Sequence, residues 1–444
     1  MKKYILHTLS ILFLLLLSAT TFAKTVTDDP QEQVALEALL KDAELDWDDI
    51  KITKDVVIDG RNKKGRLMVR RKGRNKKWPV SQMSDQRIYF DPNGKVIAIN
   101  INDSRLKKTS FINAFKSLVF FSCGYSDNYI ELDSIKDLPY LEEVSMRYSG
   151  VRQIGTLENL PQIKYIDLSR NPITKLENLD KIPSLKKLIL KGVRVDKIEG
   201  LDNLPNLEEL NITDSGKDEQ LISKLEGLDN LKKLKILTLR FQGIEKLEGL
   251  DNLTQLEEIY LTENKIKKIE GLDNLKQLKI LGLTRNRIRK IENLDNLTQL
   301  ETLYLDGNPI KKIENLGALA HLKTLLLYST DISRIEGLDN LKSLKTLNLS
   351  YTNITKIEGL DNLENLYELR LGHTKIKKME GLDKLSNLVY LHIADTPIKK
   401  LENYENLKNL TYAYTWDMPN INPDEVKKLN RFTSENLYRR THKK

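Results

Sequence analysis

The sequence predicts an α/β fold, built as a solenoid of stacked short repeats. A large apolar residue recurs every 22 residues, at positions 234, 256, 278, 300, 322, 344, 366 and 388. The fourth and sixth positions of each repeat are apolar, as in Ile259 and Leu261, which is the spacing of one face of a β-strand. Later apolar positions step by three, as in Ile266 and Ile269, which favours a turn followed by short 3₁₀-like segments. Since one repeat cannot bury its own leucines, stacking must stabilise the fold.

The repeats are expected to form one array over residues 96–417. Earlier repeats open at Val96, Leu118, Leu141, Ile163, Leu185 and Leu207, and a degenerate repeat opens at Leu410. The step of 22 lengthens once to 27, after Leu207, where the segment 217–221 supplies extra residues. A chain of 444 residues normally suggests two or three domains, but a single period through most of it favours one elongated solenoid.

Residues 1–23 have the pattern of a secretory signal peptide. Lys2 and Lys3 precede an apolar run over 11–17, and Thr21 to Ala23 places small residues where a signal peptidase cuts. We expect cleavage near Ala23 and an exported protein, secreted, periplasmic or at the cell surface. The alternative is that the segment is retained as a membrane anchor.

Residues 24–95 are expected to form a small α+β cap for the first repeat. Asp29 and Pro30 mark the start of a helix that places Leu36, Leu39 and Leu40 on one face, where they can cover the open end of the array. Two strand pairs follow, one flanking the loop at 59–65 and one flanking the turn at 91–94, whose Asn-Gly pair favours a hairpin.

Residues 61–77 within this cap contain ten basic side chains and no acidic one. They predict a contact with a polyanion, such as phosphate, nucleic acid, acidic polysaccharide or lipid headgroups. The alternative is a solvated loop and a strand edge that lysines keep from pairing. The candidate polyanion-binding residues are Arg61, Lys63, Lys64, Arg66, Arg70, Arg71, Lys72, Arg74, Lys76 and Lys77.

Residues 418–444 are expected to form a capping helix and a basic tail. Asn422 and Pro423 repeat the helix-start pattern, and Val426, Leu429 and Phe432 can cover the far end of the array. The formal net charge of +9 is concentrated in the two ends of the chain, because the repeats themselves are close to neutral.

The repeats resemble the leucine-rich repeat superfamily, and specifically its 22-residue class found in phosphatase-regulatory-type proteins and bacterial internalins. The resemblance rests on the frame of leucine, asparagine and isoleucine positions seen in 300–319, and on the phrase at 268–275 and its near-copies. It implies a right-handed solenoid with a parallel β-sheet on its concave side, short 3₁₀ or irregular segments on its convex side, and a protein-binding role. The ninth position of each repeat is often asparagine or threonine, as in Asn264 and Thr374. We expect the row of these residues, the ninth-position row, to be structural, because its amides or hydroxyls can satisfy backbone groups.

The third, fifth, seventh and eighth positions of each repeat are expected to line the concave surface. Folding does not require aromatic residues there, so aromatic side chains at these positions predict a partner-binding surface rather than a simple strand preference. These residues are Tyr148, Tyr165, Phe241, Tyr260, Tyr304, Tyr328, Tyr351, His373, Tyr390, His392, Tyr412, Tyr414 and Trp416.

The sequence offers no constellation for catalysis. It lacks the common metalloprotease, hydrolase and phosphate-loop motifs, and the one cysteine, Cys123, falls at a core-facing position. His373 and His392 lie in neighbouring repeats, but two histidines alone do not predict a metal site. We therefore expect a monomeric, non-enzymatic protein without cofactor or metal that recognises a protein partner and no specific nucleic acid. The alternative is a polyanion-binding or surface-adhesion protein, and a more remote one is a phosphatase-regulatory-type scaffold.

Overall fold

The computed structural model describes residues 27, 29–45, 47–54, 56–61, 67–71, 78–79, 86–102, 106–125, 129–213, 222–418 and 420–441, with only the backbone for 57–61, 67–71 and 78–79. The expected signal segment and the extra residues at 217–221 lie outside this part of the chain. The chain divides into two compact units, Met1–Gly150 with Glu158–Gln162 and Val151–Leu157 with Ile163–Lys444. Each unit is described by itself.

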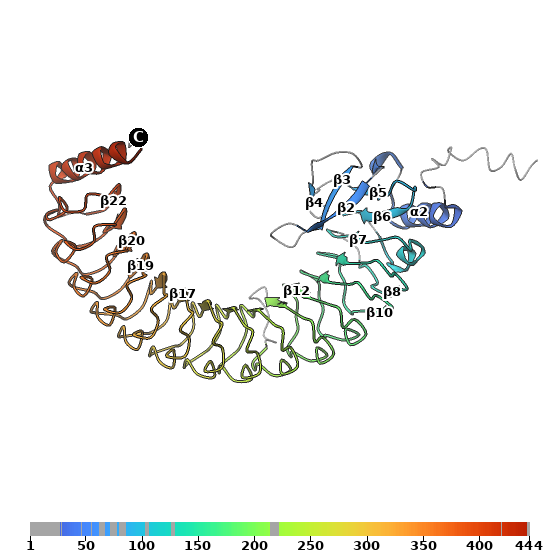
Figure 1. The fold of residues 1–444 in the computed structure, drawn as a ribbon, viewed down its shortest axis with the longest axis horizontal. Helices are drawn as coiled ribbons and strands as arrows, with labels where there is room; N and C mark the ends of the chain where they lie inside the picture. The colour runs from blue at the N-terminus through green and yellow to red at the C-terminus, as the bar shows by residue number, and fades with distance from the viewer. Residues whose placement is uncertain are drawn as a thin grey trace, which may run out of the picture. The chain divides into compact units, whose positions relative to one another are not determined.

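The first unit combines a helix, a small antiparallel sheet and the first strands of the solenoid (Figure 1). Its central sheet runs β1–β5–β6–β7–β9, in which β5 and β6 are antiparallel and the other pairs are parallel. Strands β2, β3 and β4 form a separate antiparallel sheet, and both predicted strand pairs are therefore confirmed. The elements are α2 (Pro30–Asp42), η1 (Trp47–Asp49), β1 (Lys51–Thr53), β2 (Val56–Arg61), β3 (Leu67–Arg71), β4 (Trp78–Pro79), β5 (Arg87–Phe90), β6 (Val96–Asn100), η3 (Ser110–Ala114), β7 (Phe120–Ser122), β8 (Ser134–Lys136) and β9 (Glu143–Ser145). Strand β10 (Thr156–Glu158) follows in sequence.

Helix α2 begins where the sequence predicts, with the Asp29 carboxylate accepting the amides of Gln31 and Glu32. Glu32 does not complete a capping box. Its buried carboxylate instead accepts the Val96 amide at 3.1 Å and the Thr27 hydroxyl at 3.2 Å. These bonds fix the start of the helix to the start of β6, although the pKa of Glu32 is raised because burial disfavours its charge.

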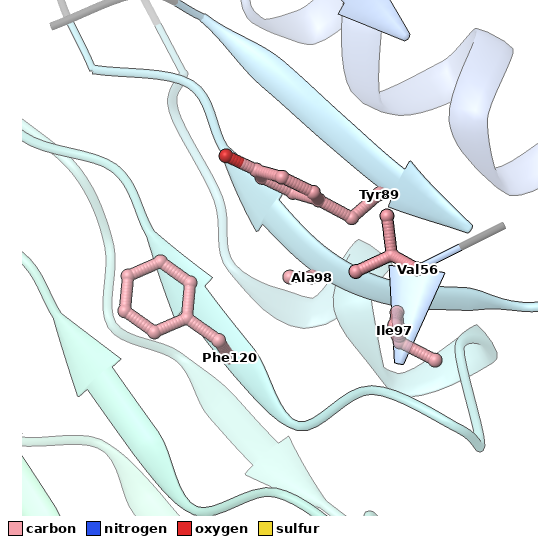
Figure 2. Close-up of a cluster of buried hydrophobic side chains, with 5 residues drawn as sticks. All are labelled: Val56, Tyr89, Ile97, Ala98 and Phe120. Atoms are coloured by element: carbon pink, nitrogen blue, oxygen red, sulfur yellow. The ribbon is translucent and has the colours of Figure 1, made fainter. Parts of the chain in front are cut away.

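The outward face of the first strands of the solenoid is covered by the first unit's own side chains. Figure 2 shows Val56 of β2 and Tyr89 of β5 packed with Ile97, Ala98 and Phe120 of β6 and β7. Ala98 and Phe120 occupy the third position of their repeats, which the sequence places on the concave surface, yet both are almost completely buried. The concave positions of these first strands are therefore covered, whereas Tyr148 of the next repeat in the same unit is 42% exposed.

The second unit is a regular stack of parallel strands, which confirms the predicted solenoid. Strands pair in register, so that Ile259, Leu281 and Leu303 of successive repeats lie side by side and are fully buried. The strands lie along the inner side of this unit's curve (Figure 1). They are β11 (Tyr165–Asp167), β12 (Lys187–Lys191), β13 (Glu209–Thr213), β14 (Ile236–Thr238), β15 (Glu258–Tyr260), β16 (Ile280–Gly282), β17 (Thr302–Tyr304), β18 (Thr324–Leu326), β19 (Thr346–Asn348), β20 (Glu368–Arg370), β21 (Tyr390–His392) and β22 (Tyr412–Tyr414).

The outer side of each repeat consists of turns. The amide of Leu275 donates to the carbonyl of Leu272, and the amide of Leu278 donates to that of Leu275, both at 3.0 Å. These bonds span three residues, as in a 3₁₀ helix, and they account for the apolar step of three in the sequence.

The ninth-position row is structural, as predicted. The Asn286 amide group donates to the carbonyls of Leu283 at 3.0 Å and of Leu261, in the preceding repeat, at 2.9 Å, while its oxygen accepts the Ile266 amide at 3.0 Å. A threonine cannot do as much, because the Thr374 hydroxyl donates only to Leu371 of its own repeat, at 2.7 Å. Asparagine therefore ties neighbouring repeats together, and threonine does not.

Two positions of each repeat have a left-handed backbone, with φ between 51° and 81° in the second unit. The sixteenth position is always glycine or asparagine: Asn178, Gly200, Gly227, Gly249, Gly271, Asn293, Asn315, Gly337, Gly359, Gly381 and Asn403. The eighth position, directly after the strand, instead carries diverse and often bulky residues: Arg170, Gly192, Phe241, Glu263, Arg285, Gly307, Ser329, Tyr351, His373, Asp395 and Asp417. Left-handed geometry is costly for a residue with a side chain, so this difference calls for an explanation.

Helix α3 (Pro423–Thr441) covers the last repeat. Leu429 is fully buried, the Phe432 ring lies 5.2 Å from that of Tyr404, and the Asn436 amide group donates to the Leu410 carbonyl at 3.0 Å. The helix includes most of the segment expected to be a basic tail. Within the described residues, no helix has both the length and the apolar character needed for a membrane span.

Candidate binding surface

The strands of the second unit present alternate side chains to the inner surface. In β15, for example, Ile259 is buried in the core, whereas Glu258 and Tyr260 on either side of it are half-buried and face outward. The same alternation in β21 and β22 leaves Tyr390, His392, Tyr412 and Tyr414 facing outward. The eighth position extends this surface beyond the end of each strand.

One group of rings lies along the carboxyl ends of the last strands. The ring of Tyr351 lies 4.9 Å from that of Tyr328 and stacks on His373 at 3.9 Å. His373 in turn contacts Trp416 edge-on at 5.8 Å, and its Nδ1 is paired with the Asp395 carboxylate. Tyr351 and His373 occupy the left-handed eighth position, whereas Tyr328 and Trp416 occupy the seventh.

A second group lies along the amino ends of the same strands. Tyr390 stacks on Tyr412 with centroids 4.5 Å apart and an angle of 7°, and it lies 5.3 Å from Tyr367. The Arg440 guanidinium of α3 lies 5.8 Å from the centre of the Tyr367 ring. Tyr367 was missed by the sequence reasoning because it occupies the second position of its repeat, which is not one of the outward strand positions.

His392 extends the first group. Its ring lies 5.8 Å from Tyr414 and 6.1 Å from Trp416, and it rests on Gly372, where an added Cβ would come within 2.4 Å of Nδ1. Burial lowers the pKa of His392, and the nearby charges of Arg370 and His373 lower it further. The neutral ring is therefore favoured. The two groups, which lie on the same strands, are together named the aromatic patch: Tyr328, Tyr351, Tyr367, His373, Tyr390, His392, Tyr412, Tyr414 and Trp416.

The patch is accessible to a partner. Trp416 is 56% exposed, Tyr351 47% and Tyr414 46%, although aromatic side chains are usually buried. With neighbouring strands about 4.8 Å apart, five repeats span roughly 19 Å. That length suits one side of a typical protein interface, which covers about 800 Å².

The other aromatic residues predicted for the site lie outside the patch and have partners within the chain. The Tyr260 hydroxyl donates to Glu258 at 2.9 Å, and its ring lies 5.0 Å from the Arg240 guanidinium. Burial, and after it the hydrogen bond to Glu258, raises the pKa of Tyr260 to about 12. The Tyr165 hydroxyl donates to Asp167 at 3.0 Å and its ring lies 5.8 Å from Lys187. Phe241 is exposed and Tyr304 half-buried, and neither makes a ring contact with another described residue. Tyr148, in the first unit, lies 5.6 Å from Tyr125.

The basic segment at 61–77 cannot be described as a surface. Arg61, Arg70 and Arg71 belong to strands β2 and β3, whose side chains here lie outside the described part, and the other seven basic residues lie outside the described residues altogether. Binding of a polyanion there stays a prediction.

The described residues form neither a metal cluster nor a reactive thiol. No three His, Cys, Asp or Glu side chains gather within the described ranges to hold an ion. Cys123 is completely buried, and burial raises the pKa of its thiol, which disfavours the thiolate.

Exposed lysines of the outer surface pair with the acid at the same position one repeat earlier, as in Lys267 with Glu245 at 2.7 Å and Lys279 with Glu257 at 2.6 Å.

Comparison with known proteins agrees with the repeat frame. A model of leucine-rich repeats in two copies matches residues 342–384, and a second leucine-rich repeat model matches residues 254–310. The chain is a leucine-rich repeat protein. No curated protein matches the sequence of this leucine-rich repeat protein.

Several solved structures share its fold. An internalin, inlF, from Listeria monocytogenes is 22% identical with a TM-score of 0.60, and the match covers 72% of this chain and 90% of the internalin. A leucine-rich repeat protein from Leptospira interrogans is 22% identical with a TM-score of 0.60, covering 75% and 93%. The ectodomain of a plant membrane receptor kinase from Arabidopsis thaliana, in complex with Casparian strip integrity factor 2, is 20% identical with a TM-score of 0.55, covering 77% of this chain and 46% of the receptor. At these identities the likeness establishes the fold alone.

Proposed function

We propose that this leucine-rich repeat protein is an exported, non-enzymatic protein that binds a protein partner through the aromatic patch. The observation that carries the proposal is the two groups of contacting, partly exposed rings on the strands of the last repeats. Tyrosine and tryptophan bury a large area while losing little side-chain freedom, which is why they dominate binding energy in protein interfaces. Export is proposed from the pattern of residues 1–23.

The position of the patch also supports a binding role rather than a structural one. Buried leucines and isoleucines already fill the interior of the same repeats, so the rings of Tyr351, Tyr414 and Trp416 are not needed for the core. An exposed apolar surface of this extent is itself a cost in a soluble protein, since it promotes association. A partner that covers it removes that cost.

The test compares two triple variants. Replacing Tyr351, Tyr414 and Trp416 by Ala removes the most exposed rings of the patch. Replacing Tyr165, Phe241 and Tyr260 by Ala removes the same kind of residue outside it and serves as the control. Proteins captured from host or envelope extract by the unaltered chain are identified by mass spectrometry, and affinity for the captured partner is then measured with all three proteins.

We expect the patch variant to lose at least about tenfold in affinity, because a single hot-spot residue contributes about 2 kcal/mol or more. The control variant should bind as the unaltered chain does. A control that loses binding while the patch variant retains it would place the interface elsewhere, and unchanged binding by both would reject the concave surface. Circular dichroism must show that all three proteins are folded.

A further inference from the structure

We infer that the segment of the partner bound by the aromatic patch carries arginine side chains, inserted at the carboxyl ends of strands β20 to β22. This inference rests on the proposed function and adds the chemistry of the partner. It comes from which rings of the concave surface already have a cation and which do not.

Three tyrosines of this surface receive a cation from the chain itself. Lys187 lies over Tyr165, Arg240 over Tyr260 and Arg440 over Tyr367, each with its charge 5.0 to 5.8 Å from the ring centre. The electron-rich face of an aromatic ring attracts a positive charge, and arginine also stacks on it. The chain thus repeatedly uses this interaction on this surface.

The most exposed rings of the patch are the exception. Among the described residues, no cation lies over Tyr351, Tyr414 or Trp416. Acids adjoin them instead: Asp417 follows Trp416 directly, and Asp395 is linked to it because the Asp395 amide donates to the Trp416 carbonyl at 3.2 Å. The Asp395 carboxylate is shared with His373, whereas no pairing is seen for Asp417 among the described residues. These rings and acids together offer a cation both a face to stack on and a carboxylate to pair with.

The charge of the surrounding surface agrees with a cationic partner. The outward positions of the last three repeats hold the acids Glu368, Asp395 and Asp417 and the single base Arg370. Arg370 is already paired with Glu368, its Nε lying 2.5 Å from the carboxylate. The chain as a whole carries +9, so this acidic, aromatic edge differs in sign from the molecule that bears it.

Shape makes arginine a better fit than lysine. A flat cation can stack on the exposed rings of Tyr414 and Trp416 while it pairs with the Asp417 carboxylate. A guanidinium presents five N–H donors and no acceptor in a rigid plane, whereas an ammonium is a compact, strongly hydrated charge.

The probe is an acetylated and amidated octa-arginine peptide, compared with octalysine and octaglutamate. The protein is labelled with 5-fluorotryptophan, and the ¹⁹F resonance of Trp416 is assigned with Trp416→Phe. The chain has three tryptophans, so Trp47 and Trp78 serve as internal references. Titration at several salt concentrations gives the Kd from the resonance of Trp416 itself, which excludes binding elsewhere from the measurement.

We expect octa-arginine to shift the Trp416 resonance with a Kd several-fold below that of octalysine, and octaglutamate to leave the resonance unchanged. The double variant Asp395→Asn with Asp417→Asn should raise the Kd for octa-arginine about three- to tenfold. The matched control Asp331→Asn with Asp361→Asn removes the same charge from exposed sites outside the patch and should not change it. Equal binding of octalysine, or no effect of the first double variant, overturns the inference.

The same variants separate this inference from the proposed function. If the captured partner is lost with Trp416→Ala but kept with Asp395→Asn and Asp417→Asn, the arginine assignment is wrong and the patch remains a binding site. If neither variant impairs capture, both proposals fall.

Discussion

Because the backbone at Tyr351 is left-handed, we predict that a glycine variant is more stable than an alanine variant there, the opposite of the order at an ordinary strand residue. Tyr351 has φ of 60°, which costs a residue with a side chain about 1–2 kcal/mol relative to glycine. Tyr351→Ala keeps this cost, and Tyr351→Gly removes it. Both variants lose the same ring contacts with Tyr328 and His373, so the difference between them reports the backbone alone.

The magnitude follows from two opposing terms. Relief of the left-handed geometry favours the glycine variant by about 1–2 kcal/mol, while the greater freedom of glycine in the unfolded chain opposes it by about 0.5–1 kcal/mol. Tyr351→Gly should therefore be more stable than Tyr351→Ala by about 0.5–1 kcal/mol. At Thr346, in the extended strand β19, glycine should instead be less stable than alanine by a similar amount.

The assay is urea unfolding followed by circular dichroism, with the midpoint and slope compared within each Ala and Gly pair. Long repeat arrays can unfold in parts, so hydrogen exchange in the affected repeats provides a second measure. A Tyr351→Ala variant as stable as Tyr351→Gly, or the same order at Tyr351 and Thr346, would refute the claim that the eighth position is strained.

Three further predictions concern the interior and the patch. Asn286→Ala should lower the free energy of unfolding in urea by about 3 kcal/mol, because it leaves buried backbone groups of two repeats without partners. Thr374→Ala removes one bond and should lower it by about 1 kcal/mol. Equal losses would show that asparagine does not tie the repeats together more strongly than threonine. The pKa of His392 is lowered by burial, Arg370 and His373, so the folded state binds fewer protons than the unfolded one. The stability that this shift contributes is present above pH 6.5 and is lost as pH falls through the lowered pKa. The stability advantage of the unaltered chain over His392→Gln should therefore shrink from pH 7 to pH 5. A constant advantage would argue against a lowered pKa. The Cys123 thiol should not react with a thiol reagent in buffer and should react fully in urea, and reaction at equal rates would show that it is not buried.

The strained eighth position bears on function because the chain relieves the same strain elsewhere. At Gly271, which occupies a sixteenth position, a side chain is disfavoured twice: φ is 66°, and an added Cβ would lie 2.0 Å from the Leu247 carbonyl oxygen. Where asparagine replaces glycine there, its amide donates to the corresponding carbonyl, as Asn293 does to Ile269 at 2.7 Å. The eighth position has no such device, and it keeps Tyr351 and His373. Strain that persists at an exposed surface is typical of functional sites.

The period of the sequence was enough to predict the solenoid and its core. Because strands of successive repeats pair in register, a residue such as Leu281 is placed by its position in the repeat alone. The same argument identified the outward positions, and hence most residues of the patch. Contacts between their side chains could not be predicted, since they depend on rotamers. Tyr260 and Tyr414 occupy the same position of their repeats, yet only Tyr260 has an acid and a cation of its own as partners.

Two features had no sequence signal. Nothing about Tyr351 marks a left-handed backbone, because a bulky tyrosine does not favour it. Glu32 stands three residues after the Asp29 cap, the spacing of a capping box, but its partner Val96 is far away in sequence and is brought near only by the fold. Long-range pairs of this kind are invisible to local patterns.

The aromatic patch coincides with a change in the interior of the solenoid. Repeats from 322 to 388 carry threonine at the ninth position, so the inter-repeat bonds that Asn286 and Asn308 make are missing from the part of the array that carries the patch. Ring contacts such as that between Tyr351 and His373 join these repeats at the surface instead.

A consequence is that the patch repeats should open more readily than those before them. The amides of Ile266 and Ile288 donate to asparagine oxygens of the next repeat at 3.0 Å, whereas Ile354 faces a threonine whose hydroxyl is directed to its own repeat. We expect faster hydrogen exchange at Ile354 than at Ile266, and restored protection in Thr374→Asn. Looser coupling lets the strand-end rings adjust to a partner with little change in the core. Because binding then orders these repeats, conformational entropy is lost and the net binding free energy is reduced. Equal protection at the two isoleucines would show that threonine couples the repeats as well as asparagine does, and that the patch is as rigid as the rest of the array.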